Sequence, residues 1–376
     1  MQARLPVTVI TGFLGAGKTT LLRHLLVNSG QRLAVMVNEF GSVGLDGDLI
    51  RSCGFCPEDE VEGRLVELNN GCLCCTVQDE FLPTMETLLQ RSDQLDGIVV
   101  ETSGLALPRP LLKALEWPAI RKRVHVNGVV TVVDGEALSA GSPVGDSAAL
   151  ERQRQEDPNL DHLTAIDELF KDQLEAADLV LISRSDRLDG PQMESVQQQL
   201  AERVRSGAGT LAISRGVVDP TLVLGMNLSH ESRLVDDDPQ QGSDGHDLDH
   251  HHHHDHDHDH THVEAVSGQI RLNGSFDRGQ LEQLLSSFVI DHDVIRIKGR
   301  LWIQGKTLPL QIQMVGPRLE SWFESAPIEA WKPAGSQGLE LVVIGFQSDS
   351  TRQLEDRLNQ DCLHQARLQK TSLQNI

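Results

Sequence analysis

The first half of the chain alternates short apolar runs with longer amphipathic segments. The runs are three to five residues long, rich in Val, Ile and Leu, and bounded by polar or Gly-rich turns, which is typical of buried strands. They lie at residues 7–10, 33–37, 65–68, 98–100, 129–133, 179–182 and 211–213. Helical periodicity fills several of the intervals, at 19–27, 80–91 and 166–177. Strands that alternate with helices predict a mostly parallel sheet with helices on both faces.

The pattern changes abruptly near Asp236. Residues 236–262 are mostly Asp, His, Gly, Gln and Ser, so this segment cannot build a core and is predicted to be a disordered linker. Apolar alternation then resumes, and it predicts strands at 265–272, 294–302, 308–315 and 339–346, a helix at 278–288 and a polar helix at 350–368. The predicted units are an α/β domain at 1–235, the linker at 236–262, a smaller α+β domain at 263–349 and a polar helical tail at 350–376.

Composition narrows the classes of partner. The chain has 376 residues, of which 39% are hydrophobic, which is enough for a large core. Its 33 basic and 55 acidic residues give a net charge of −22, which argues against nucleic acids and anionic membranes as partners. We see no signal-peptide pattern and no apolar run of membrane-spanning length, so we expect a cytoplasmic protein.

A phosphate-binding motif follows the first apolar run. Residues 12–19 have the sequence GFLGAGKT, which matches GxxxxGKT between a strand and a helix. Its glycines let backbone N–H groups turn toward one anion, and the helix N-terminus adds its positive dipole end. Lys18 is expected to reach the β- and γ-phosphates, and the Thr19 hydroxyl to bind Mg²⁺. The predicted nucleotide-binding residues here are Gly12, Gly15, Ala16, Gly17, Lys18, Thr19 and Thr20.

A carboxylate ends the strand predicted at 98–100. Glu101 is therefore the candidate acid at Mg²⁺ or at its coordinated water, and with Lys18 it forms the predicted catalytic pair. Gly104 follows in the same turn and is expected to offer its backbone N–H to the γ-phosphate. An ordinary exposed acid at a strand end is the alternative for Glu101.

The base-reading segment departs from the usual NKxD pattern. After the strand predicted at 179–182 the chain has Ser183, Arg184, Ser185 and Asp186. The Asp186 carboxylate can accept both N–H groups on the edge of guanine, which adenine does not offer. Because Ser replaces Asn and Arg replaces Lys, the preference for GTP rests mainly on Asp186.

Three thiols lie close together between the predicted strands at 65–68 and 98–100. Cys72, Cys74 and Cys75 place sulfurs within reach of one ion, and thiolates suit Zn²⁺ or Co²⁺ rather than Mg²⁺. Three ligands leave a coordination position open, which favours exchange of a cargo metal, and Glu39 is a candidate oxygen ligand. Small buried hydrophobic side chains are the alternative interpretation of the thiols. The separate pair at 53 and 56 fits either a structural zinc site with Cys72 and Cys74 or a metal-free loop.

The predicted linker is rich in histidine. Ten His alternate with Asp between His246 and His262, and an internal tract of this kind does not resemble a terminal expression tag. Neutral imidazoles bind Co²⁺, Ni²⁺, Zn²⁺ and Cu²⁺, so the linker is expected to collect several ions weakly. The candidate ligands are His250, His252, His254, His256, His258 and His260.

These motifs together resemble the CobW-type metal-chaperone GTPases of the P-loop class. The matching segments are VTVITGFLGAGKTTLLRHLL, the turn at 38–41, VELNNGCLCCTV, IVVETSGLALPRPLL, GVVTVVDG, the DPNLDH stretch and the His/Asp tract. The resemblance covers nearly the whole chain and is strongest to members associated with cobalamin biosynthesis.

The resemblance implies a GTPase that loads a divalent metal into a receiving protein. Cobalt for a cobaltochelatase is the expected cargo, and zinc is the alternative within the same family. The expected cofactors are GTP, Mg²⁺ and Co²⁺ or Zn²⁺, and a nucleotide-dependent homodimer is a further expectation. A passive metal-storage protein and a small-molecule kinase with a structural zinc are the rival classes.

Overall fold

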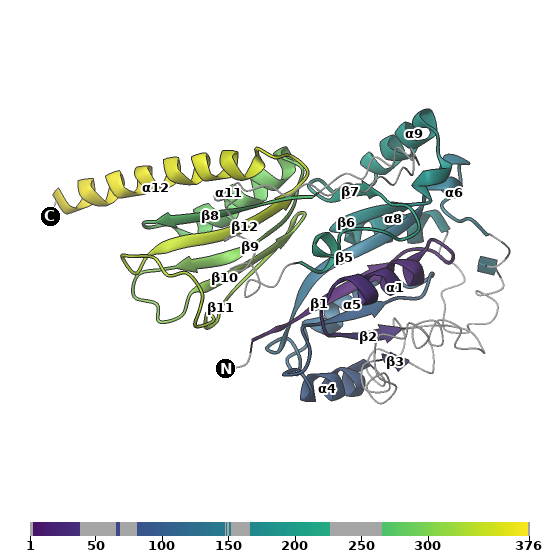
Figure 1. Cartoon of the computed structure of the whole chain (residues 1–376), viewed down its shortest axis with the longest axis horizontal. Coiled ribbons are helices and arrows are strands. Elements are labelled where there is room, and N and C mark those ends of the chain that lie inside the picture. Colours follow the sequence, from purple (N-terminus) through teal and green to yellow (C-terminus); the bar gives the residue numbers. More distant parts are fainter. Residues whose placement is uncertain are drawn as a thin grey trace, which may run out of the picture.

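The structure is a computed structural model that describes residues 3–37, 65–67, 81–146, 148, 150–151, 166–225 and 265–374. In these ranges the chain forms two sheets that lie side by side, each with its own helices (Figure 1). We call them the N-terminal sheet and the C-terminal sheet.

The N-terminal sheet has seven strands, and all of its pairings are parallel. Every predicted strand of the first half is present, although β5 begins earlier and runs for 11 residues because all of its positions are buried. The order is β3-β2-β4-β1-β5-β6-β7. The strands are β1 (Leu5–Thr11), β2 (Leu33–Val37), β3 (Leu65–Glu67), β4 (Gly97–Glu101), β5 (Val124–Asp134), β6 (Leu179–Ser183) and β7 (Gly209–Ala212).

Helices cover both faces of this sheet, because successive buried side chains of a strand point to opposite sides. Val35 and Val99 pack in one hydrophobic cluster with α1, whereas Met36 and Val100 pack in another with α4 and α5. The helices of the first face are α1 (Lys18–Asn28) and α10 (Pro220–Leu224). Those of the second are α4 (Leu82–Gln90), α5 (Pro108–Leu115), α8 (Ile166–Ala176) and α9 (Gly190–Ala201). The predicted parallel, doubly covered sheet is confirmed.

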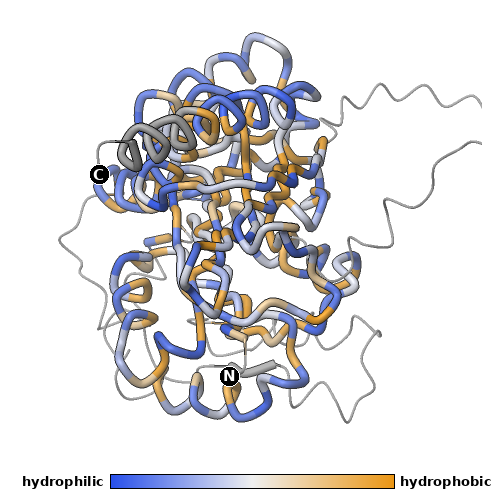
Figure 2. The backbone as a smooth tube through the Cα atoms, turned by 90° about the vertical axis from the view of Figure 1, so that its left-hand side faces the viewer, coloured by the Kyte–Doolittle hydropathy of each residue, from blue (hydrophilic) through white to orange (hydrophobic). Residues whose placement is uncertain are grey.

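The C-terminal sheet is antiparallel and has the order β11-β10-β9-β12-β8. Its edge strand β11 was not predicted from sequence, because its side chains are mostly half-buried and show no clear alternation. The strands are β8 (Val266–Asn273), β9 (Val294–Trp302), β10 (Leu310–Val315), β11 (Arg318–Phe323) and β12 (Gly338–Gly345). One face packs under α11 (Arg278–Asp291) and the start of α12 (Ser350–Gln374), where Leu354 and Leu358 are fully buried. The hydropathy colours of Figure 2 place hydrophobic residues in the interior and hydrophilic residues on the outer helical turns.

The other face of the C-terminal sheet meets the N-terminal sheet through a buried polar joint. The Arg296 guanidinium on β9 donates to the Leu222 carbonyl at 2.6 Å and to the Asn127 carbonyl at 3.2 Å. Asn127 in turn donates to the Thr8 hydroxyl on β1 at 2.9 Å. Burial lowers the pKa of Arg296 to about 9, so the side chain is still largely charged near neutral pH. The joint therefore fixes the second sheet directly against the central strands of the first.

Candidate nucleotide site

The loop between β1 and α1 has the backbone shape of an anion cradle. Gly12, Gly15 and Gly17 have φ values of 134°, 75° and 104°, which residues other than glycine rarely adopt. A Cβ at Gly12 would also lie 2.1 Å from the Val132 carbonyl oxygen, so only glycine fits beside β5. The first turn of α1 contains no acidic residue, and its N-cap Gly17 has no capping side chain. Backbone N–H groups and the helix dipole thus favour an anion at this point.

Lys18 is the first residue of α1, and its side chain folds back onto the phosphate loop. Its side chain is 7% exposed, and its Nζ donates a hydrogen bond to the Phe13 carbonyl oxygen at 3.1 Å. A buried ammonium held by its own loop is a ready partner for phosphate oxygens.

Thr19 and Glu101 meet at the edge where β1 and β4 end. The register pairs Ile10 with Glu101, and the Thr19 hydroxyl donates to Glu101 Oε1 at 3.1 Å. Glu101 is 4% exposed, so it is not an ordinary exposed strand-end acid. A hydroxyl and a carboxylate at this distance are the hard oxygen ligands that suit Mg²⁺.

The turn after β4 is pressed against the phosphate loop. A Cβ at Gly104 would lie 2.5 Å from the Leu14 nitrogen, so the backbones can approach this closely only because residue 104 is glycine. From α8, the Gln173 side-chain amide donates to the carbonyl oxygens of Gly104 at 3.3 Å and Ala106 at 3.4 Å, and the Gln173 backbone carbonyl accepts from the Thr131 hydroxyl. Gln173 was not predicted from the sequence, because a single buried glutamine in an amphipathic helix matches no motif.

The segment after β6 also contacts the phosphate loop. Arg184 has a φ of 55°; its Nη2 donates to the Gly15 carbonyl at 2.9 Å, and its guanidinium forms an ion pair with buried Asp134. The Ser183 hydroxyl donates to the Val133 carbonyl at 3.1 Å, and Asp186 is exposed on the 3₁₀ turn Ser185–Arg187. Ser183 and Arg184 therefore lie beside the phosphate loop, and the role of Asp186 in reading the base stays a prediction. Asp134 was missed as a partner, although its position at a strand end before Gly135 was the available signal.

The predicted cargo-metal residues lie outside the described residues. These are Glu39, Cys53, Cys56, Cys72, Cys74, Cys75 and the His tract from His246 to His262. Glu67 is the last described residue before the three thiols in the sequence, and Val37 pairs with Glu67 on one side and with Glu101 on the other. Cys72 follows Glu67 by five residues in the sequence. Among the residues that the structure does describe, no three His, Cys, Asp or Glu side chains are grouped to hold a metal.

The fold and this site define a P-loop nucleotide-binding protein. Residues 6–211 match the model of the CobW/HypB/UreG nucleotide-binding domain, and 265–363 match the cobalamin synthesis protein cobW C-terminal domain. The chain belongs to this CobW/HypB/UreG family, and it is a P-loop GTPase.

Named relatives extend the comparison. The chain is 43% identical over 349 residues to the zinc chaperone CobW of Pseudomonas aeruginosa, covering 92% of this chain and 89% of the relative. It is 44% identical over 133 residues to the zinc-regulated GTPase metalloprotein activator 1 of Schizosaccharomyces pombe, covering 34% and 31%. The crystal structure of the Zn(II)-bound YjiA GTPase of E. coli is 22% identical with a TM-score of 0.39, covering 96% and 99%. In the described part of the chain no helix is both long and apolar enough to span a bilayer.

Proposed function

We propose that this GTPase is a zinc chaperone, which holds Zn²⁺ on thiolates in one nucleotide state and releases it to a receiving protein in another. The observation that supports this most is the 43% identity to a protein named a zinc chaperone, which extends over 92% of this chain and 89% of the relative. The predicted cargo ligands are Cys72, Cys74 and Cys75, and thiolates are the ligands that zinc prefers.

The nucleotide half of the cycle follows from the described contacts. When GTP binds, its phosphate oxygens replace the Phe13 carbonyl oxygen as the hydrogen-bond acceptor of the Lys18 ammonium. Residues Gly12 to Thr19 surround these phosphates. Thr19 and Glu101 are the residues that would hold Mg²⁺, whose charge offsets that of the phosphate oxygens. The Glu101 carboxylate would also orient the water that attacks the γ-phosphate.

Metal binding is connected to nucleotide binding through the ends of adjacent strands. The thiol-bearing segment begins after Glu67, two strands away from Glu101 in the order β3-β2-β4, or roughly 10 Å across the sheet. In the GTP state the Gly104 N–H binds the γ-phosphate and orders the turn after β4. Hydrolysis removes that contact, the neighbouring segments loosen, and the metal is released.

Cobalt is a second candidate cargo. It is favoured by the match of residues 265–363 to a domain named for cobalamin synthesis, and the receiving protein would then be a cobaltochelatase. Three thiolates with an open position accept Co²⁺ as well as Zn²⁺, so the donor set does not decide between the metals.

A competition titration with a chromophoric chelator tests the proposal. We expect the Zn²⁺ affinity of the full chain to rise at least about tenfold from the GDP state to the state with Mg²⁺ and a non-hydrolysable GTP analogue, and Co²⁺ to bind more weakly. The Cys74→Ser variant is expected to lose this site, whereas Cys362→Ser, a thiol on α12, keeps it. Retention of the site in Cys74→Ser would refute the thiolate assignment, and tighter binding of Co²⁺ would favour the cobalt candidate.

A further inference from the structure

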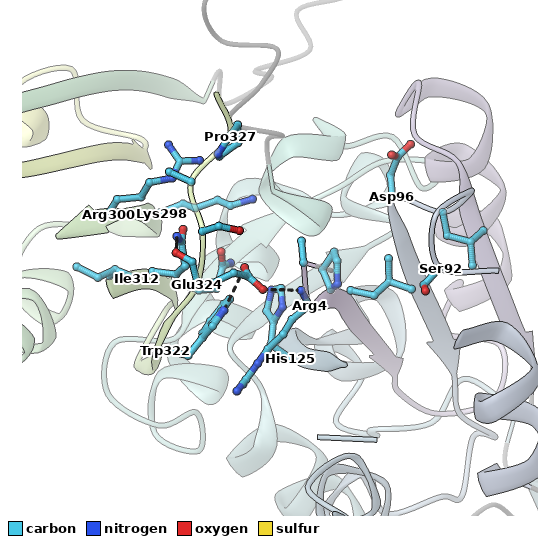
Figure 3. Close-up of a pocket in the computed structure, with 18 of the residues that line it drawn as sticks. Arg4, Ser92, Asp96, His125, Lys298, Arg300, Ile312, Trp322, Glu324 and Pro327 are labelled. Atoms are coloured by element: carbon cyan, nitrogen blue, oxygen red, sulfur yellow. Dashed lines mark hydrogen bonds between the residues drawn. The ribbon is translucent and has the colours of Figure 1, made fainter. Parts of the chain in front are cut away.

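A cleft lies between the two sheets, at the end of the N-terminal sheet opposite to the phosphate loop. Its volume is about 570 Å³, within the range of small-molecule sites. Arg4 and His125 enter it from the starts of β1 and β5, and Lys298 and Arg300 enter from β9, with Trp322 between them (Figure 3). The seven residues of β1 separate the cleft from the phosphate loop by roughly 20 Å, so it is distinct from the nucleotide site.

Three residues that line this cleft each carry one buried polar atom without a hydrogen-bond partner among the described residues. The atoms are His125 Nδ1, Arg300 Nε and Gln313 Oε1, and each of these residues is less than a tenth exposed. Buried polar atoms are nearly always hydrogen-bonded, so one unsatisfied atom already calls for an explanation. Three such atoms, contributed by both sheets to one cavity, indicate that the cavity holds a molecule with polar groups of its own.

The fixed charges around the cleft favour an anion. Burial, and after it the charges of Lys298, Arg4 and Arg296, lower the pKa of His125 to about 3, so the imidazole is neutral near pH 7. The electrostatic potential around His125 is therefore positive, and the neutral imidazole adds no charge of its own. Three carboxylates line the cleft: Asp96 pairs with Arg32, Asp93 also acts on Arg32, and Glu324 accepts from the Arg4 backbone N–H and from Trp322. Arg300 is itself paired through Nη1 with buried Glu340 at 3.0 Å, which leaves its Nε for another partner.

Much of the remaining wall is apolar. Pro6, Leu95 and Pro327 line the cleft, and the Trp322 ring lies 4.7 Å from the His125 ring, measured between centroids. A bare inorganic ion would leave these surfaces in contact with water, whereas an organic molecule covers them. Water alone satisfies polar atoms but gains nothing from the apolar wall.

We propose that this cleft binds a small organic anion, which carries a carboxylate or a phosphate on a partly apolar body. The anionic group accepts a hydrogen bond from Arg300 Nε and lies near the Lys298 ammonium. The body of the ligand stacks against Trp322 and donates to Gln313 Oε1. Because both sheets contribute to the cleft, a bound ligand also bridges them.

Saturation-transfer NMR on the full chain with GDP bound tests this proposal, since GDP occupies the phosphate loop. The probes are phenylacetate, phenyl phosphate and the neutral 2-phenylethanol. We expect at least one anion to bind with a Kd of about 1–10 mM, in the range that a probe of ten heavy atoms allows. The alcohol is expected to bind at least about tenfold more weakly, because it gains no charge-assisted hydrogen bond. The tighter of the two anions identifies the preferred head group.

A pair of charge-neutralising variants locates the site. Lys298→Gln is expected to weaken anion binding at least about fivefold, and Lys306→Gln, which removes the same charge from an exposed position after β9, leaves it within about twofold of wild type. Trp322→Leu is expected to weaken binding of both anions by loss of the apolar wall. The proposal is overturned if neither anion saturates below about 20 mM, if the alcohol binds equally well, or if the two lysine variants behave alike. None of these outcomes depends on metal binding, so the zinc proposal stands or fails separately.

Discussion

The two ends of the N-terminal sheet differ in how their polar groups are built. At the carboxyl ends of β1 and β4, Lys18 and Thr19 come from one continuous motif, and Glu101, 82 residues further along the chain, ends a neighbouring strand of the same sheet. At the amino ends of β1 and β5, His125 and Arg300 are brought together from two sheets that lie far apart in the chain. The nucleotide end forms within one sheet from motifs that can be recognised in the sequence. The cleft forms only when the two sheets pack against each other.

The two ends also prepare their sites differently. The nucleotide end uses glycines and a helix terminus, which present backbone N–H groups to an anion, although Ser103 Oγ and Gln173 Oε1 nearby are also buried without a hydrogen-bond partner among the described residues. The cleft leaves three buried polar atoms without partners, at a cost of about 1–3 kcal/mol each unless another molecule satisfies them.

Removal of the Lys18 ammonium should be the most damaging change at the nucleotide end. We expect Lys18→Ala to lower kcat/KM for GTP hydrolysis by about a thousandfold, roughly 4 kcal/mol, because the triphosphate loses its only charged partner in the loop motif. Steady-state phosphate release measures this. The control Lys113→Ala, at an exposed position on α5, should match wild type. A loss of less than about tenfold in Lys18→Ala would show that the loop does not hold the phosphates as described.

The choice of base should depend on Asp186. Asp186→Asn is expected to reduce the preference of mant-GTP over mant-ATP by about a hundredfold, because an amide cannot accept both N–H groups of guanine. Glu194→Gln on the neighbouring helix α9 is the charge-matched control. If wild-type protein binds mant-ATP as tightly as mant-GTP, the guanine assignment is wrong.

The close approach of Gly104 to the phosphate loop can be tested with one added methyl group. In Gly104→Ala the Cβ would lie 2.5 Å from the Leu14 nitrogen, so the turn must shift, and we expect kcat to fall by about 10–100-fold. Gly190→Ala adds the same methyl group where no atom lies within 4 Å, and its kcat should not change. Equal rates in the two variants would mean that the turn after β4 takes no part in hydrolysis.

The buried His125 at the cleft should make the free energy of unfolding depend on pH. The folded-state pKa of His125 is about 3, whereas its ordinary value is 6.5, so the unfolded chain binds a proton that the folded chain does not between these values. Stability is therefore unaffected above about pH 6.5 and decreases as pH falls, by about 2 kcal/mol at pH 5. Denaturant unfolding of wild type and His125→Gln from pH 7.5 to pH 5 measures the difference. Parallel curves would contradict the burial of a neutral imidazole beside Arg4, Arg296 and Lys298.

The same contrast explains what sequence could and could not predict. The seven strands of the N-terminal sheet were predictable, because each is a short apolar run bounded by turns, and Glu101 was predictable as the acid that ends one of them. Gln173 and Asp134 were not identified, because their roles arise from contacts with a turn and with Arg184 that only the fold creates. The edge strand β11 and the cleft were missed for the same reason: their residues follow no local period and match no motif.

The central claim is that nucleotide and metal binding are coupled, and thermodynamic reciprocity gives the most direct test. If GTP tightens Zn²⁺ binding by some factor, Zn²⁺ must tighten GTP binding by the same factor. We would measure the affinity of the full chain for a non-hydrolysable mant-GTP analogue with Mg²⁺, in the presence and absence of one equivalent of Zn²⁺. We expect Zn²⁺ to tighten binding of the analogue by at least about tenfold in wild type and not in Cys74→Ser. An analogue affinity that does not change with Zn²⁺ would contradict it.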